Sequence, residues 1–372
     1  MVEYSIAGAG PSDHVRQDAM TAAAVLQQGG AQPSLAAKVR HLKRADSYPD
    51  GVARVETIET HMSWVFLTEC HAYKLKKPVR YDFLDFSTLA ARRRDCEAEV
   101  YLNRRLAPNV YLGTVPLTDA DGGGLALHGS GRVVDWLVQM RRLPRDRMLD
   151  RMIREGTLRE SEIRAAAAVL SRFFLAAAPV RTDIADYRAR LAADISDNAR
   201  VLVQPDGGLP ADEVRCLTAA QARFLQRDGL LLDRRVASGR LIEGHGDLRA
   251  EHICLEATPV VIDCLEFKRD FRILDPADEL AFLAIDCERH GAAWIRALLF
   301  DVYGDITGDQ PPEALINFYS SYRALLRAKI ALWHLHEPDV HTPATWRRLA
   351  LEYLRLGQRY AGRSNDFVQI DD

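Results

Sequence analysis

One stretch of the chain, residues 242–267, gathers side chains that can bind a metal ion or move a proton. It holds His245, Asp247 and His252, and Asp263 follows further along. Carboxylates and imidazoles are common ligands of catalytic metal ions and common general bases. The residue types alone are consistent with a metal-dependent hydrolase that uses all four side chains as ligands, and with an enzyme that activates a hydroxyl group.

A hairpin is predicted to position these groups. Two apolar runs, residues 253–255 and 260–262, flank the turn-forming linker Glu256-Ala257-Thr258-Pro259. If the hairpin is symmetric about that linker, His252 lies opposite Asp263. The loop that precedes the hairpin is expected to leave His245 and Asp247 exposed.

The same residues carry a resemblance to a known family. His245-Gly246-Asp247, with His252 five positions after the aspartate and then Ile262-Asp263, resembles the catalytic and metal loops of the aminoglycoside phosphotransferase and choline kinase group. These are small-molecule kinases with the protein-kinase fold. The resemblance implies that Asp247 accepts the proton of a substrate hydroxyl and that Asp263 holds Mg²⁺, with Mn²⁺ as the alternative.

The resemblance also implies roles for the neighbouring residues. His245 is expected to brace the catalytic loop, and Glu266 to support the metal or add a ligand to it. His252 occupies the position of an Asn in the group, and we expect it to share the metal with Asp263. Because Mg²⁺ prefers oxygen ligands and imidazole is softer, this departure bears on the identity of the metal and on activity itself.

A second motif agrees in order and spacing. Asp275-Pro276-Ala277-Asp278-Glu279-Leu280-Ala281 resembles the Asp-Pro-x-x-Asp-Leu-Ala run of the aminoglycoside phosphotransferases, with Glu279 in the second acidic position. It also predicts a helix start, with an N-cap aspartate and proline in the first turn.

Upstream, the pattern predicts the elements that a nucleotide-binding lobe needs. Strands are expected at residues 55–60, 64–67, 72–79, 111–117 and 132–140, giving a five-stranded sheet, with one helix over residues 87–106. Lys74 and Lys76 point to one face of their strand and Lys77 to the other. The resemblance implies that Lys74 neutralises the α and β phosphates of ATP, with Lys76 as the reserve candidate, and that Glu99, on the inward stripe of the helix, pairs with it.

Two further nucleotide contacts are placed by order along the chain. The turn Thr60-His61-Met62-Ser63 stands where a kinase has its phosphate-covering loop. It contains no glycine, so Ser63 and the neighbouring backbone are the candidates for that contact. Residues 138–141, which include Gln139 and Met140, are expected to form the hinge that binds adenine.

Beyond Pro144 the chain is predicted to be helical. Apolar positions recur at helical spacing over residues 149–155, 160–178, 184–203, 211–228, 292–303, 312–333 and 343–360. Arg323 and Arg327 lie one turn apart and could hold an anionic substrate or the acidic cluster Glu266, Asp275 and Asp278. The predicted organisation is a weakly ordered segment at residues 1–34, an N-lobe at 35–142 and a helical C-lobe at 143–372.

Composition limits the classes of function. The chain has 372 residues, of which 49 are basic and 52 are acidic, for a net charge of -3. This balance gives no general field for nucleic acid or an anionic membrane, so phosphate binding must be local. Six scattered cysteines without a C-x-x-C pair favour a reduced, cytoplasmic protein. No signal peptide or membrane-spanning run is recognised.

These observations predict an α+β, protein-kinase-like fold of two lobes and an ATP-dependent phosphotransferase acting on a small-molecule hydroxyl. Some bacterial proteins of the resembling family continue into a P-loop ATPase domain. No G-x-x-x-x-G-K-[ST] occurs here, so such a domain would be a separate partner. The alternatives are a nucleotide-sensing pseudokinase and the metal-dependent hydrolase. Tightly bound zinc or iron in the purified protein would favour the hydrolase.

Overall fold

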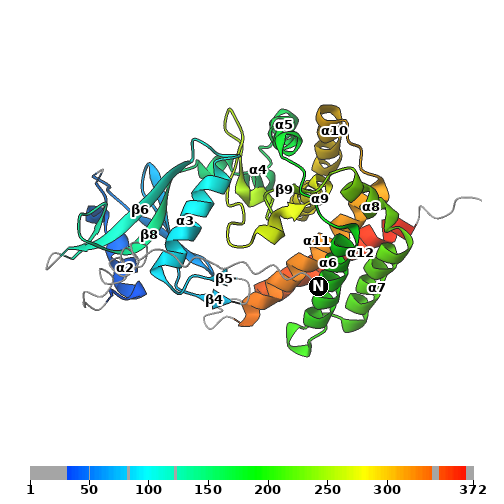
Figure 1. Ribbon diagram of the computed structural model, residues 1–372, viewed down its shortest axis with the longest axis horizontal. Helices are drawn as coiled ribbons and strands as arrows, with labels where there is room; N and C mark the ends of the chain where they lie inside the picture. Colours follow the sequence, from blue (N-terminus) through cyan, green and yellow to red (C-terminus); the bar gives the residue numbers. More distant parts are fainter. Residues whose placement is uncertain (1–31, 50, 82–83, 121–123, 337–342, 366–372) are drawn as a thin grey trace, which may run out of the picture.

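A six-stranded antiparallel sheet forms the N-terminal lobe (Figure 1). The computed structural model describes residues 32–49, 51–81, 84–120, 124–336 and 343–365, so most of the segment predicted to be weakly ordered lies outside the described residues. The strands follow the order β1-β2-β3-β8-β6-β7, with bounds β1 Glu56–Glu59, β2 Ser63–Leu67, β3 His71–Lys76, β6 Tyr111–Ala120, β7 Gly124–Leu127 and β8 Arg132–Arg141. The prediction of five strands missed β7, a short strand that returns along β6.

A helix covers each face of this sheet. Helix α3 (Leu89–Asn103) is capped by Thr88, whose side chain accepts a hydrogen bond from the Ala91 amide, one residue beyond the predicted start. It packs on the face that holds Ala72 and Val138. The unpredicted helix α2 (Leu35–Leu42) packs on the other face. The alternation along β3 therefore sends Lys74 and Lys76 toward α3.

The C-terminal lobe is helical (Figure 1). Its helices are α4 Leu149–Glu155, α5 Glu160–Ala176, α6 Ile184–Leu202, α7 Ala211–Arg227, α8 Leu230–Ala237, α9 Pro276–Arg289, α10 Ile295–Thr307, α11 Glu313–Trp333 and α12 Pro343–Asn365. All the predicted helices are present within a few residues of their expected ends, and α8 was not predicted. Helix α9 starts as the sequence indicates, with Asp275 accepting a hydrogen bond from the Ala277 amide and Pro276 in the first turn.

Two pairs of short strands carry the loops of the candidate site and pack against these helices. They pair as β9 (Ile242–Glu243) with β12 (Ile273–Leu274) and β10 (Ile253–Cys254) with β11 (Val260–Val261). Cys254 and Val260 of this second hairpin join the same apolar cluster as Ala72, Val100 and Met140 of the N-lobe. The two lobes therefore share part of their core.

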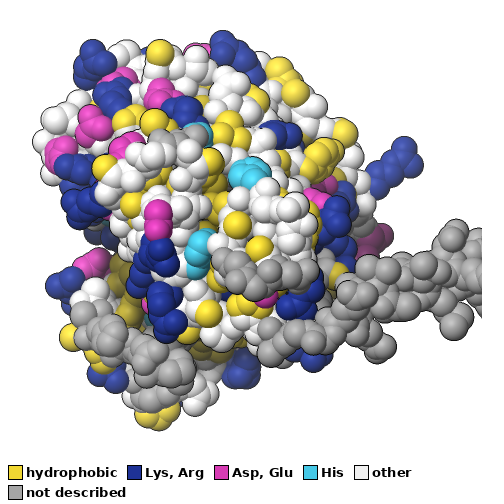
Figure 2. Space-filling model, turned by 90° about the vertical axis from the view of Figure 1, so that its left-hand side faces the viewer, with side chains coloured by type: hydrophobic (Ala, Val, Ile, Leu, Met, Phe, Trp, Pro, Cys, Tyr) yellow, Lys and Arg dark blue, Asp and Glu magenta, His cyan; other side chains and the backbone are white. Residues whose placement is uncertain are grey.

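The surface agrees with the balanced composition. Figure 2 shows basic and acidic side chains both distributed over the face viewed, with apolar groups between them. Among the described residues, no helix has both the length and the apolar character needed to cross a membrane.

Candidate functional site

The β10–β11 hairpin has a register one residue away from the predicted one. Ile253 pairs with Val261, and the Ile262 amide donates to the His252 carbonyl at 2.9 Å. The prediction that pairing alone places His252 opposite Asp263 is therefore wrong. Asp263 leaves the strand with a φ of 62°, in the left-handed region that few non-glycine residues adopt. This turn swings its carboxylate back, so that Oδ2 lies 3.6 Å from His252 Nε2.

His245 is buried, which corrects the expectation that the loop leaves it exposed. Its Nε2–H donates to the Ile262 carbonyl at 2.9 Å, and its Nδ1 accepts the Asp247 amide at 3.3 Å. Burial lowers the pKa of His245 to about 4, so the ring is neutral at pH 7. With both nitrogens bound to backbone, the ring holds the loop of residues 245–247 against the loop that carries Asp263.

Asp247 is held by an arginine that the sequence analysis did not single out. Arg249 Nε lies 3.1 Å from both carboxylate oxygens of Asp247. Burial by itself would raise the pKa of Asp247, but the charges of Arg249, His252 and Arg327 lower it to about 2. The sequence position of Arg249 could have indicated this contact, because an arginine two residues after Asp247 can fold back onto its carboxylate.

His252 connects the two acidic groups of the site. Its Nδ1 lies 2.8 Å from the Asp247 carbonyl, which can only accept, so this nitrogen carries the hydrogen. Nε2 therefore offers a lone pair in the neutral ring. Nε2 accepts a hydrogen bond from Arg249 Nη2 at 3.2 Å and lies 3.6 Å from Asp263 Oδ2.

The predicted ion pair between strand and helix is present. Lys74 Nζ lies 2.9 Å from Glu99 Oε1, and it also reaches Asp263 Oδ1 at 2.7 Å. Partial desolvation opposes ionisation of the half-exposed Asp263, but Lys74 and His252 hold the pKa of its carboxyl well below the usual range. One ammonium group therefore joins the sheet, α3 and the metal loop.

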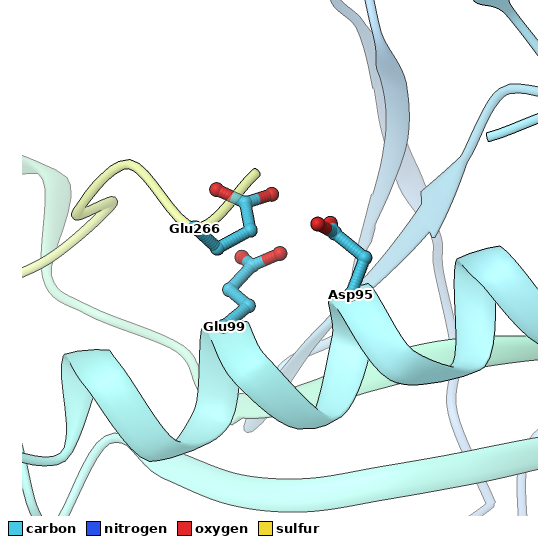
Figure 3. A group of neighbouring side chains, drawn as sticks. All are labelled: Asp95, Glu99 and Glu266. Atoms are coloured by element: carbon cyan, nitrogen blue, oxygen red, sulfur yellow. The ribbon is translucent and has the colours of Figure 1, made fainter. Parts of the chain in front are cut away.

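Lys76 binds three carboxylates, including the predicted metal supporter Glu266. Its Nζ lies 2.6 Å from Glu99 Oε2 and 2.6 Å from Asp95 Oδ2, and it contacts Glu266 Oε1. Figure 3 shows Asp95 and Glu99 projecting from one side of α3 toward Glu266. The spacing of these three carboxylates would suit a metal ion, but the Lys76 ammonium already contacts all three.

Helix α9 holds the loop of residues 245–247 through Glu279. This buried carboxylate accepts the His245 amide at 2.9 Å and the Gly246 amide at 2.5 Å. A Cβ on Gly244 would lie 2.5 Å from Glu279 Oε2, and Gly246 has a φ of 87°. The backbone at Gly246 therefore favours glycine, and a side chain at Gly244 would displace the Glu279 carboxylate. Burial raises the pKa of Glu279 to about 7, against the effect of the two amides.

The two contacts predicted from chain order differ from expectation. The Ser63 amide, a candidate for phosphate, is bound by Thr60 Oγ1 at 3.0 Å within the β1–β2 turn. Gln139 and Met140 lie inside β8 and pair with both β3 and β6. The hinge prediction was therefore placed too early, because the strand continues to Arg141. The Met140 side chain instead belongs to the apolar cluster between the lobes.

Arg323 and Arg327 divide their roles. Arg323 binds Asp278, one of the predicted acidic partners, with Nε at 2.7 Å and Nη2 at 2.6 Å. Arg327 lies near Asp247 instead, where its charge lowers the pKa of that carboxyl. Of the two arginines, therefore, Arg323 binds a member of the predicted acidic cluster, Asp278.

A divalent cation could be held by Asp263 and His252. The Asp263 side chain is 45% exposed and offers oxygen, while His252 Nε2 would offer its lone pair only by giving up the hydrogen bond from Arg249 Nη2. A cation that keeps waters and takes phosphate oxygens needs few protein ligands. The mixed oxygen and nitrogen set suits Mn²⁺ at least as well as Mg²⁺.

Some curated proteins are similar to this chain in sequence. No family model matches the chain. An uncharacterised protein of Mycobacterium tuberculosis strain H37Rv is 35% identical over 279 residues, which is 74% of this chain and 54% of the relative. An uncharacterised protein of Mycobacterium bovis gives the same values. The chain thus spans about half the length of the curated relatives it matches.

Solved structures define the fold. A choline kinase from Cryptosporidium parvum matches with a TM-score of 0.53 and 10% identity, over 90% of this chain and 96% of that one. A choline/ethanolamine kinase family protein from Mesorhizobium loti matches with a TM-score of 0.51 and 15% identity, over 88% of this chain and 99% of that one. The GDP complex of an aminoglycoside 2'-phosphotransferase matches with a TM-score of 0.50 and 14% identity, over 88% of this chain and 99% of that one. The resemblance read from the motifs is confirmed at the level of the fold: this chain has the two-lobed fold of the aminoglycoside phosphotransferases and the choline kinases.

Proposed function

We propose that this protein is a phosphotransferase that moves the γ-phosphate of ATP to a hydroxyl group of a small molecule. The observation that carries the proposal is the meeting of Lys74 and Glu99 from the N-lobe with Asp263 from the C-lobe loop. Asp247 adjoins this group through His252. Kinases of the protein-kinase fold use a divalent cation, a strand lysine and a second carboxylate around the nucleotide.

The binding of the nucleotide rests mainly on charge. Lys74 would neutralise the α and β phosphates while Glu99 keeps its ammonium in place. Asp263 and His252 would hold the divalent cation, which bridges phosphate oxygens and offsets the charge that develops during transfer. The solved aminoglycoside 2'-phosphotransferase holds GDP, so GTP belongs in any test of donors.

Asp247 would orient the acceptor hydroxyl and take its proton. With a pKa of about 2, it is a weak base toward a free alcohol. It acts late, because the hydroxyl becomes acidic only as its bond to phosphorus forms. Arg249 keeps the carboxylate ionised and fixes its direction, so the contribution of Asp247 is largely positional.

The hydrolase alternative is disfavoured by His245. A site with His245, Asp247, His252 and Asp263 as ligands needs a lone pair from each histidine, yet both nitrogens of His245 are bound to backbone groups. We therefore expect no tightly bound zinc or iron in the purified protein. Stoichiometric zinc that persists after dialysis would instead favour the hydrolase.

The deciding experiment is a transfer screen. Labelled ATP and GTP are incubated with hydroxyl-bearing metabolites and either the wild type or D247N. We expect one class of acceptor to be labelled, with kcat lowered about 10²- to 10⁴-fold by D247N. Nucleotide affinity, measured by calorimetry, should stay unchanged because Asp247 faces the acceptor. Full transfer by D247N would disprove its assignment, and nucleotide binding without turnover by the wild type would indicate a pseudokinase.

A further inference from the structure

The second lysine of β3 is bound more completely than the first. The Lys76 side chain is 1% exposed, and its partners Glu99, Glu266 and Asp95 are 0%, 8% and 11% exposed. By contrast, Lys74 is 15% exposed and meets Asp263, whose side chain is 45% exposed. Burying an ammonium is costly unless carboxylates surround it, so Lys76 is committed to these partners and is not free to reach a phosphate.

Glu99 is shared between the two lysines. Its Oε1 binds Lys74 and its Oε2 binds Lys76. The predicted pair between strand and helix is therefore half of a larger arrangement, in which Glu99 cannot follow Lys74 without giving up Lys76. The contact with Lys76 would therefore keep the carboxylate in place if Lys74 changed its partner.

Lys76 also fixes the metal loop from a second point. Glu266 stands three residues after Asp263, so β3 meets this loop through two contacts, Lys74 with Asp263 and Lys76 with Glu266. The first contact uses the groups that a bound nucleotide and its cation would engage. The second lies behind them. Burial raises the pKa of Glu266, and the Lys76 ammonium opposes that shift.

We propose that Lys76 is a positioning residue: it holds Glu99 and the loop that carries Asp263 in place while Lys74 and Asp263 exchange each other for phosphate and a divalent cation. This inference rests on the proposed function. It assigns the reserve lysine of the sequence analysis a role distinct from that of Lys74. It also assigns Glu266, three residues after Asp263, to Lys76 and not to the cation.

The test compares K76M with K77M. Lys77 is the next residue of the chain, points to the other face, and pairs with the half-exposed Glu59. In K76M we expect the Mg²⁺ concentration for half-maximal transfer to rise about tenfold or more, as when a residue behind a metal ligand is removed. Nucleotide affinity without metal should change little, because Lys76 does not reach the phosphates. K77M should match the wild type in both measurements.

A second variant protects the test against misfolding. K76M leaves buried carboxylates without their ammonium, so K76M/E266Q, which removes one of those charges, is measured beside it. The double variant should recover melting temperature but keep the raised Mg²⁺ requirement. A merely structural lysine would show the reverse, with a normal Mg²⁺ requirement in every variant that folds.

The outcomes separate the two proposals. If the wild type transfers phosphate and the folded Lys76 variants need no more Mg²⁺ than it does, the positioning role is overturned and the proposed function stands. If the wild type binds MgATP but no acceptor is found, the Mg²⁺ dependence of ATP binding is compared instead, with the same expected shift. If the wild type binds no nucleotide, the proposed function fails and takes this inference with it.

Discussion

Arg249 sets the charge state of the carboxylate that would meet the acceptor. Its guanidinium faces both oxygens of Asp247 and also approaches His252. Burial pushes the pKa of Asp247 upward, and the arginine is the largest opposing influence. At the scale of single residues, the charge of Asp247 therefore depends on Arg249, a residue that is not part of the His245-Gly246-Asp247 motif.

Replacing this arginine should change the pH dependence of the reaction. In the wild type, Asp247 with a pKa of about 2 stays ionised from pH 5 to pH 8, so its protonation imposes no acid limb there. In R249M burial is no longer opposed by the guanidinium, the pKa rises, and kcat/KM should fall as the pH is lowered. Initial rates between about pH 5 and 8 measure this. R200M, on the exposed surface of α6, is the control, and identical profiles for R249M and wild type would contradict the argument.

His252 should determine which metal works best. Its nitrogen ligand tolerates Mn²⁺ better than Mg²⁺, whereas an amide oxygen suits Mg²⁺. We expect H252N to raise the ratio of Mg²⁺- to Mn²⁺-supported activity by about tenfold. Rates at saturating concentrations of each metal give this ratio. A ratio unchanged by H252N would show that the imidazole is not a ligand.

At the scale of elements, the start of α9 holds the loop that carries His245 and Asp247. Glu279 of this helix accepts two successive loop amides, those of His245 and Gly246. Asp278, beside it, binds Arg323 of α11. The Asp-Pro-x-x-Asp-Leu-Ala resemblance thus marks a segment that supports the site and is fully buried beneath it.

The ionisation of Glu279 should change how the free energy of unfolding depends on pH. Burial raises its pKa from 4.5 to about 7, so between these pH values the folded state holds a proton that the unfolded chain releases. Its contribution therefore makes the free energy of unfolding fall as the pH rises through that window. E279Q keeps an oxygen acceptor but does not titrate.

Denaturant unfolding of both proteins at several pH values measures the difference. The slope of the free energy of unfolding against pH should be less negative in E279Q than in the wild type between about pH 4.5 and 7. Parallel curves would mean that Glu279 titrates at its ordinary pKa. E160Q is a suitable control, because Glu160 lies on the surface in an exposed ion pair with Arg164.

At the scale of the whole molecule, the two lobes share a core. Cys254 and Val260 of the β10–β11 hairpin pack with Ala72, Val100 and Met140 of the N-lobe. Arg141 at the end of β8 also forms a bidentate ion pair with Glu256 in the linker of that hairpin. A shared apolar cluster couples the unfolding of one lobe to that of the other.

We therefore expect one cooperative thermal transition. V260A should lower the free energy of unfolding by about 1–3 kcal/mol through loss of buried methyl groups, while the transition stays single. I58A, at a half-exposed position on β1, should have a much smaller effect. Scanning calorimetry distinguishes the cases, and two separate transitions in the wild type would show that the lobes unfold independently.

Much of the architecture could be predicted because its signals are local. Apolar periodicity located the helices of the C-lobe, and Asp275-Pro276 gave the start of α9. The inward stripe of α3 put Glu99 on the right face to meet Lys74. The strand β7 and helices α2 and α8 were missed, since short elements depend on packing more than on their own pattern.

The sequence by itself determined which residues could do chemistry and which elements carry them, because residue type, spacing and periodicity are properties of neighbouring positions. Only the tertiary structure decided how they meet. A register shifted by one residue and the left-handed turn at Asp263 brought His252 to that carboxylate. Lys76 met Glu266 across 190 positions, and Glu279 reached the His245 amide across 34. Such contacts depend on how separate elements pack, which no local pattern specifies.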